Sequence, residues 1–223
     1  MSAPTVFTFS VDSALLRELG EKLVSTVHVA LAELVKNAYD ADASAVRVSI
    51  TPQAKGGPTI VIEDNGTGMT PTEVANFWMR IGTTNKEDTP MSRLFGRPRT
   101  GRKGVGRFAC RRLGSRLKLE TIATIEDPKK GSWVTARTVV DFNWDEFVPG
   151  TTVESVDCKG LTETLPGKKI TGTKLVISNA DADEWQVRGF EYLRRQLAVM
   201  AGNSGARREG FEEDPGFSVD LDA

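Results

Sequence analysis

The residues best suited to chemistry in this sequence are a carboxylate and an amide one helical turn apart. Glu33 and Asn37 stand at i and i+4, and Asp40 follows at i+7, so one helical face presents all three side chains. Asn is a poor helix-interior residue, but its amide oxygen suits Mg²⁺, which keeps several waters and takes few protein oxygens. A carboxylate at Glu33 could accept a proton from an attacking water. The alternative is the solvated polar face of an amphipathic helix, and the mid-helix Asn37 favours a functional role.

A second candidate is the segment Asp64-Asn-Gly66-Thr-Gly68-Met69, which follows an apolar strand pattern. Asn-Gly alone is an ordinary turn signal. An Asp at the exit of a strand, however, can be half-buried and accept a hydrogen bond from an exocyclic amine. Glycines on either side let the backbone approach a flat ring without a Cβ in the way. This segment therefore predicts a site for a purine base.

A third candidate is the glycine loop that starts at Gly101. It departs from a Walker A loop, because Arg107 and Phe108 replace the required Lys and Ser/Thr. It also lacks the preceding strand of a Rossmann loop. What remains is a loop that presents N–H groups to phosphates at a helix N-terminus. No acidic residue occurs from Arg93 to Lys118, which suits a polyphosphate, although a solvated basic face is the plainer interpretation. The candidate phosphate contacts are Gly101, Lys103, Gly104, Val105, Gly106 and Arg107.

The elements that would position these groups follow from hydrophobic periodicity. Helices are expected at 11–42 with a break near 25–26, at 72–79 after a Thr70 cap, at 105–113 and at 183–200. Strands are expected at 45–50 and 59–63, paired as a hairpin, and at 116–124, 133–142, 151–156 and 173–178. The segment 83–102 is a long polar loop of the kind that is often functional. Helices on one face of a mixed, mostly antiparallel sheet would make an α+β domain.

Composition excludes several classes of protein. The 223 residues carry 29 basic and 30 acidic side chains, so the whole chain is not a nucleic-acid-binding polycation. Its two cysteines form neither a metal-ligand pattern nor a disulfide framework. The N-terminus lacks the regions of a signal peptide, and no stretch approaches the ~20 apolar residues of a membrane span. A cytoplasmic protein that does not contact a membrane is expected.

In order and content, the three segments resemble the N, G1 and G2 boxes of the GHKL ATPases: gyrase B, heat-shock chaperones, histidine kinases and MutL. The match is nearest to heat-shock-chaperone-like and MORC-like bacterial ATP-binding proteins. The resemblance implies the Bergerat fold, a two-layer α/β sandwich that binds ATP and Mg²⁺. It implies Glu33 as the catalytic base and Asn37 as the Mg²⁺ ligand. The other implied ATP contacts are Asp40, Asp64 at adenine, Gly66, Gly68, Met69, Thr173 beneath adenine, and the glycine loop.

We therefore expect an ATP-binding domain at 1–203 with a lid at about 83–103, and an acidic tail or linker to a further domain at 204–223. The expected function is Mg²⁺-dependent ATP binding and slow hydrolysis, coupled to lid closure and homodimerisation, as the N-terminal module of a longer protein. Nucleic acid or a client protein would bind through further domains. The alternative is a nucleotide-sensing module with negligible turnover, which the absence of a downstream basic finger favours. A histidine kinase is disfavoured, because no acceptor helix precedes the domain.

Overall fold

The protein is built on a seven-stranded sheet with strand order β5-β4-β3-β6-β2-β1-β7. The computed structural model describes residues 10–55, 57–81, 89–99, 106–126, 131–166, 170–181, 185, 194–195, 197–198 and 208–222. All neighbouring strands run antiparallel except β1 and β7, which are parallel. The strands are β1 Ala45–Thr51, β2 Thr59–Asp64, β3 Arg116–Glu126, β4 Trp133–Asn143, β5 Lys159–Leu165, β6 Gly172–Ser178 and β7 Ser218–Asp222.

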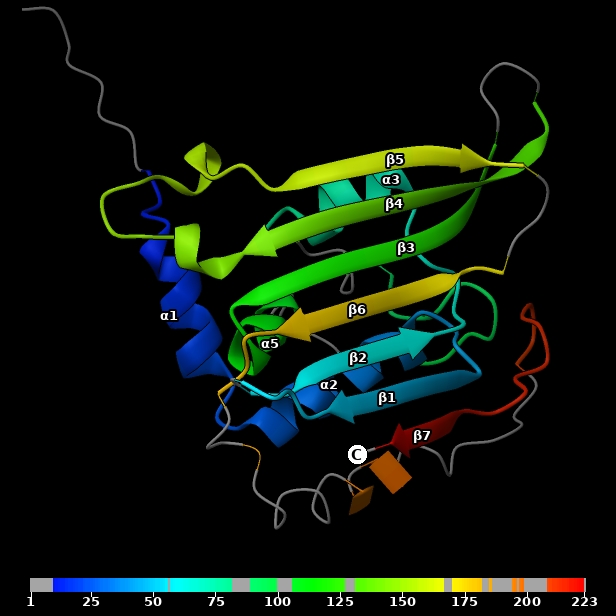
Figure 1. The fold of residues 1–223 in the computed structure, drawn as a ribbon. Coiled ribbons are helices and arrows are strands. Elements are labelled where there is room, and N and C mark those ends of the chain that lie inside the picture. The colour runs from blue at the N-terminus through cyan, green and yellow to red at the C-terminus, as the bar shows by residue number, and fades with distance from the viewer. Residues whose placement is uncertain are drawn as a thin grey trace, which may run out of the picture.

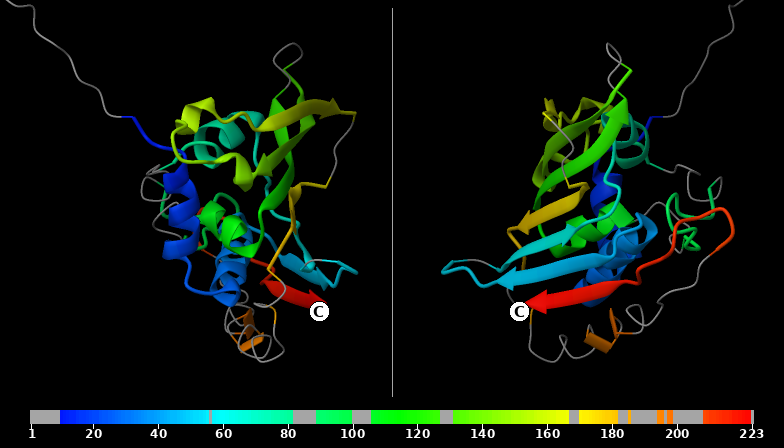
Figure 2. Two further views of the ribbon diagram at one scale, coloured as in Figure 1. Left: turned by 60° about the vertical axis from the view of Figure 1, so that its left-hand side comes forward. Right: turned by 90° about the vertical axis from the view of Figure 1, so that its right-hand side faces the viewer.

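The helices cover one face of this sheet (Figures 1 and 2), which confirms the predicted α+β layout. They are α1 Ala14–Leu23, α2 Val27–Asp40, α3 Pro71–Glu73 continued by a π-helical turn at Val74–Trp78, and α5 Gly106–Leu113. The predicted break before α2 is present, and the Thr26 side chain caps α2 by accepting from the Val29 N–H. Thr70 and Glu73 form a capping box at α3, as the Thr70 cap predicted.

The core lies between the helices and the sheet. The apolar face of α2 is buried against it through Leu31, Leu34, Val35 and Ala38, and α5 adds Phe108. The strands present alternate residues to the helices, because side chains along a strand point to opposite faces. These core-facing residues include Val46, Val48, Ile60, Ile62, Leu117, Leu119, Val140, Phe142, Leu175 and Ile177. The other face of the sheet, which we call the open face, carries no helix among the described residues.

The structure differs from the sequence-based expectation in three elements. The prediction of a strand at 151–156 is wrong, because Val153–Ser155 forms a 3-10 turn. Strand β5 was not expected, since its residues are almost all exposed and show no apolar alternation. Strand β7 lies in the segment expected to be an acidic tail, where Val219 and Leu221 pack against the core. The helix expected at 183–200 falls mostly outside the described residues.

Candidate functional site

Helix α2 holds the first group of predicted site residues. Glu33 and Asn37 are partly buried and Asp40 is buried. The Glu33 side chain keeps 32% of its exposure, and its Oε1 accepts from Lys36 Nζ at 2.6 Å. This carboxylate is therefore reachable by water while an ammonium group holds its orientation. Asn37 lies one turn further along the same helix and is partly buried.

Asp64, the last residue of β2, is held by the backbone on two sides. Its Oδ1 accepts from the Gly66 N–H at 2.9 Å and from the Thr173 N–H at 3.3 Å. Burial, with a smaller contribution from the neighbouring Glu63 charge, raises the pKa of Asp64 to about 6. Among the described residues, the hydrogen bonds to this carboxylate reach Oδ1, which leaves Oδ2 to accept from a ligand. The structure thus brings together Asp64, Gly66 and Thr173, as the resemblance implied.

Two glycines permit the close approach of strands around Asp64. Gly68 has φ +65, and a Cβ there would lie 2.1 Å from the Ile122 carbonyl oxygen. Gly172 begins β6 with φ +152, and a Cβ there would lie 2.1 Å from the Asp64 carbonyl oxygen. Any other residue at either position would push the loop or strand away. Both glycines therefore keep the loop after β2 close against β3 and β6.

Thr121 belongs to the site although the sequence analysis did not identify it. It is fully buried on the helix-facing side of β3. Its Oγ1 accepts from the Met69 N–H at 2.8 Å and lies 3.2 Å from Thr173 Oγ1 and from the Gly172 carbonyl oxygen. It therefore joins the loop after β2 to the start of β6. The available signal was a hydroxyl residue at the position where the Leu117–Leu119 alternation requires an apolar side chain.

The loop after β2 is also fastened to the C-terminal end of α2. The Thr67 N–H donates to the Ala41 carbonyl oxygen at 2.9 Å. The Asn65 side-chain oxygen accepts from the Ser44 and Ala45 N–H groups, each at 2.9 Å. Because these bonds span the junction of α2 and β1, the Glu33–Asn37 group and the Asp64 group sit on one connected unit.

The glycine loop is the part of the site that stays a prediction. Gly101, Lys103, Gly104 and Val105 lie outside the described residues, and the side chain of Arg107 does too. Gly106 begins α5, which packs against α2 and α1. The chain thus passes from the glycine loop into a helix that packs beside α2.

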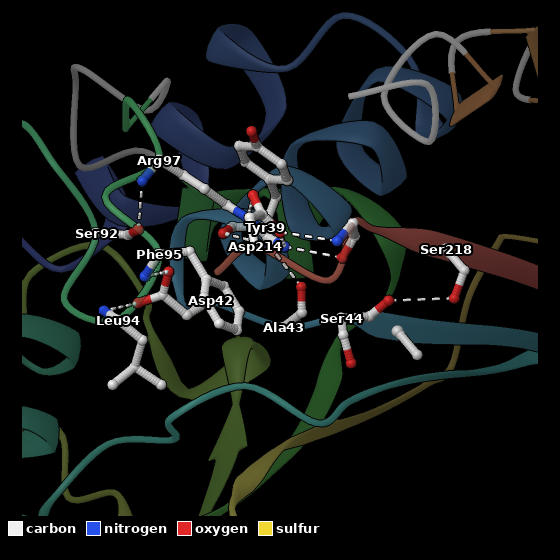
Figure 3. A network of polar contacts seen from close by, with 12 residues as sticks. Tyr39, Asp42, Ala43, Ser44, Ser92, Leu94, Phe95, Arg97, Asp214 and Ser218 are labelled. Carbon is white, nitrogen blue, oxygen red and sulfur yellow. Dashed lines mark hydrogen bonds and ion pairs between the residues drawn. The ribbon is translucent and has the colours of Figure 1, made fainter. Parts of the chain in front are cut away.

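The second half of the expected lid is built into the domain (Figure 3). The Arg97 guanidinium is fully buried and makes a bidentate pair with Asp214, with Nε–Oδ2 at 2.8 Å and Nη2–Oδ1 at 2.5 Å. It also donates to the Ala43 carbonyl oxygen and stacks over the rings of Tyr39 and Phe95, at 4.5 and 4.9 Å from their centroids.

A second set of bonds fixes the backbone of the same segment. The Asp42 carboxylate accepts from the Leu94 and Phe95 N–H groups at 2.8 and 3.2 Å. The Ser92 hydroxyl accepts from the Arg97 N–H at 2.7 Å. Residues 91–99 fall within the segment expected to be a polar loop and lid at about 83–103. They are instead clamped between the end of α2 and the segment that leads into β7, because Arg97 is buried and paired.

The comparison that decides the family is a sequence profile described as "Histidine kinase-, DNA gyrase B-, and HSP90-like ATPase", which matches residues 24–164. The chain belongs to this family. The matched region runs from just before α2 to β5. It therefore contains the Glu33–Asn37 group, the loop after β2 and the glycine loop. Membership supports ATP binding by this domain.

A curated protein similar to this chain is the "Putative type II restriction enzyme HgiDII" of Herpetosiphon aurantiacus. It is 37% identical over 102 residues, which cover 46% of this chain and 15% of that protein. Within the described part of the domain, no helix is long and apolar enough to cross a membrane. The same part holds no cluster of three or more His, Cys, Asp or Glu side chains suited to a metal.

Proposed function

We propose that this ATPase domain binds ATP with Mg²⁺ and hydrolyses it slowly. The observation that carries the proposal is the Asp64 carboxylate, whose Oδ1 is held by two backbone N–H groups while Oδ2 is left for a ligand. An exocyclic amine of adenine donating to Oδ2 fits this arrangement. Thr173, whose N–H already bonds Asp64, lies beside the same position. Met69, which follows Gly68 and is partly buried against the core, would supply an apolar contact for the ring.

The residues of α2 fit the phosphate end of the same ligand. Asn37 offers one amide oxygen, and Mg²⁺ commonly takes one or two protein ligands with waters and phosphate oxygens. The bound Mg²⁺ would neutralise phosphate charge during transfer. Glu33 lies one turn earlier and receives the proton of the attacking water. Lys36 orients the Glu33 carboxylate through the 2.6 Å ion pair, and the loop from Gly101 to Arg107 supplies N–H groups and positive charge to the phosphates.

Calorimetry with a non-hydrolysable ATP analogue, with and without Mg²⁺, tests the binding site. Asp64→Asn should weaken binding by roughly 10- to 100-fold, since hydrogen bonds to charged groups contribute about 1.5–3 kcal/mol. The matched control is Glu63→Gln, which removes the adjacent carboxylate on the open face, where Glu63 pairs with Lys174 at 3.2 Å. Equal affinity of wild type and Asp64→Asn would refute the adenine contact.

A measurement of ATP turnover separates nucleotide binding from the chemical step. Glu33→Gln keeps a polar side chain of the same size but removes the proton acceptor. We expect unchanged nucleotide affinity and a turnover lower by roughly 10²–10⁴-fold, the usual contribution of a general base. If wild type itself binds ATP with no measurable turnover, the alternative of a nucleotide-sensing module is supported. An unchanged rate in Glu33→Gln would remove this residue from the mechanism.

Lid closure and nucleotide-dependent homodimerisation are further parts of the proposal. The γ-phosphate would draw the glycine loop and the rest of the predicted lid together through charge-assisted hydrogen bonds. Hydrogen exchange over residues 83–90 and 100–107 should then slow more with an ATP analogue than with ADP. Equal protection by both nucleotides would leave a static binding site.

The restriction-enzyme relative favours a DNA-linked role over a chaperone role for the longer protein of which this domain would be a module. The shared 102 residues include less than half of the chain, so the inference concerns only the type of longer protein in which this ATPase domain occurs. The test is ATP turnover by the full-length protein with and without duplex DNA. Stimulation by DNA would support the role, and stimulation by an unfolded client protein alone would contradict it.

A further inference from the structure

Strand β5 is a free edge of the sheet. It stands at one end of the strand order and pairs with β4 alone among the described segments. Six of its seven residues are exposed, and Leu161 keeps 62% of its surface accessible. An edge strand presents a row of N–H and C=O groups that can pair with another strand. Figure 1 shows β5 along the outer border of the molecule, opposite β7.

The open face of the sheet carries a row of charges that alternate in sign from strand to strand. Asp220 pairs with Arg47 at 3.0 Å, and Glu63 pairs with Lys174 at 3.2 Å. Arg47 stands opposite Glu63 in register, and Lys174 stands opposite Glu120. Arg137 of β4 and Glu163 of β5 continue the row from Glu120, so that every strand contributes one charged residue. In strand order from β7 to β5, the row is Asp220, Arg47, Glu63, Lys174, Glu120, Arg137 and Glu163.

This charge row stops at the β5 edge in Glu163. Arg137 bonds both Glu120 at 2.6 Å and Glu163 at 2.7 Å, so the row is continuous up to the edge. A second, shorter row on the same face ends in Lys159, which stands opposite Asp141, itself opposite Lys118. The two row ends, one negative and one positive, lie two residues on either side of the exposed Leu161.

We propose that two copies of this chain pair antiparallel through β5, about a two-fold axis that passes beside Leu161 and normal to the sheet. This register sets Leu161 against Leu161 of the second copy and sets Lys159 against Glu163 twice. The alternation then crosses the edge without a break, from Glu163 to Lys159, Asp141 and Lys118 of the second copy. The same contact repeats by symmetry, as an isologous interface requires.

Charge and apolar contact together select this register over its neighbours. An axis at Thr162 would set Leu161 against Glu163, and an axis at Glu163 would set two carboxylates against each other. Opposite charges directly across a strand pair stabilise it, whereas like charges oppose it. With the axis at Leu161, Val139, which stands beside Leu161 in register, extends an apolar strip between the two charge rows.

The pairing uses no residue of the proposed ATP site, so it does not rest on the proposed function. It should form without nucleotide, so it is a separate contact from the nucleotide-dependent homodimerisation proposed above. A chain that dimerises through β5 but binds no ATP would refute the proposed function alone. A chain that binds ATP and stays monomeric without it would refute the pairing alone.

Charge reversal tests the register by sedimentation equilibrium of the full chain without nucleotide. Lys159→Glu and Glu163→Lys each place like charges opposite one another twice, and each should weaken self-association by roughly 10- to 100-fold. A mixture of the two variants restores opposite charges and should associate at least as tightly as wild type. The control Asp220→Lys makes the same charge change as Glu163→Lys on the far edge strand and should leave association unchanged.

Cross-linking tests the same register without changing charge. In a Cys158→Ser background, Leu161→Cys should form a disulfide-linked dimer under mild oxidation, because directly opposed Cβ atoms lie about 4.5–5.5 Å apart. Thr162→Cys and Glu163→Cys should not self-link. Far-UV circular dichroism and thermal melting of each variant confirm that it is folded. A monomer at concentrations up to about 1 mM, a mixture no tighter than its components, or linkage through Thr162→Cys or Glu163→Cys in place of Leu161→Cys would overturn the proposal.

Discussion

Replacing Asp64 with Asn should stabilise the unliganded protein at neutral pH. Burial raises the pKa of this carboxyl from 3.8 to about 6, so the folded protein holds the proton more tightly than the unfolded chain. Below about pH 4 the group is protonated in both states and folding has no charge to bury. As the pH rises through about 6, the folded state must hold a partly buried carboxylate, and stability is lost.

The size of this effect follows from the same two values. The difference between 3.8 and about 6, at about 1.4 kcal/mol for each pH unit, corresponds to about 3 kcal/mol of stability lost above pH 6. Asp64→Asn removes the charge but keeps Oδ1 as an acceptor for the Gly66 and Thr173 N–H groups. The free energy of unfolding should therefore exceed that of wild type by up to about 3 kcal/mol at high pH. For a domain of this size that is a Tm higher by roughly 6–12 °C.

Urea denaturation followed by tryptophan fluorescence, at a series of pH values and without nucleotide, measures the gap between variant and wild type. The difference in the free energy of unfolding between the variant and wild type should be largest above pH 7 and should approach zero toward pH 4. Asp220→Asn is the matched control, because its carboxylate is exposed and pairs only with Arg47 at the surface, which contributes about 0–1 kcal/mol. A gap that is constant with pH, or a variant less stable than wild type at pH 8, would refute the reasoning. The same variant should bind ATP poorly, so that stability rises where function is lost.

Three further substitutions test individual contacts. Gly68→Ala should destabilise the domain and abolish ATP binding, because φ is +65 and the new Cβ would lie 2.1 Å from a backbone oxygen of β3; unchanged affinity in calorimetry would contradict this. Thr121→Val, which is isosteric, leaves the partly buried Met69 N–H without its 2.8 Å acceptor and should lower the free energy of unfolding by about 1–3 kcal/mol. The matched control is Thr164→Val on the exposed edge strand. Asp214→Ala leaves the Arg97 charge buried and unpaired, at an expected loss of about 3–5 kcal/mol in urea denaturation, and the double change with Arg97→Met should recover part of that loss.

The elements that the sequence predicted well are those determined by local pattern. Apolar spacing in α2 and the alternation in β1 and β2 depend on neighbours in the chain, and the capping box at Thr70 involves residues three apart. The motif at Asp64 was predictable for a related reason, since a carboxylate before two glycines is informative within six residues. These parts of the candidate site therefore appear where the sequence placed them.

The remaining features depend on partners far apart in the chain. Arg97 reads as one more basic residue of a polar loop, and only Asp214, 117 residues later, makes it a buried anchor. Thr121 is an ordinary strand residue until Met69 and Thr173 lie beside it. Strand β5 pairs at an edge of the sheet, where its residues are exposed and show no apolar alternation. In β7 only Val219 and Leu221 alternate with polar residues, which is too short a pattern to indicate a strand.

The Arg97–Asp214 pair has a consequence for when the nascent protein can fold. The two residues are 117 positions apart, and ribosomes add roughly 5–20 residues each second. For roughly 6–25 s during synthesis, Arg97 exists without the carboxylate that its buried position requires. The segment at 91–99 cannot close onto α2 in that interval without burying an unpaired charge. Folding of the nascent domain is therefore expected to finish only after Asp214 is synthesised, and a chain stalled before that point would be an early substrate for proteolysis.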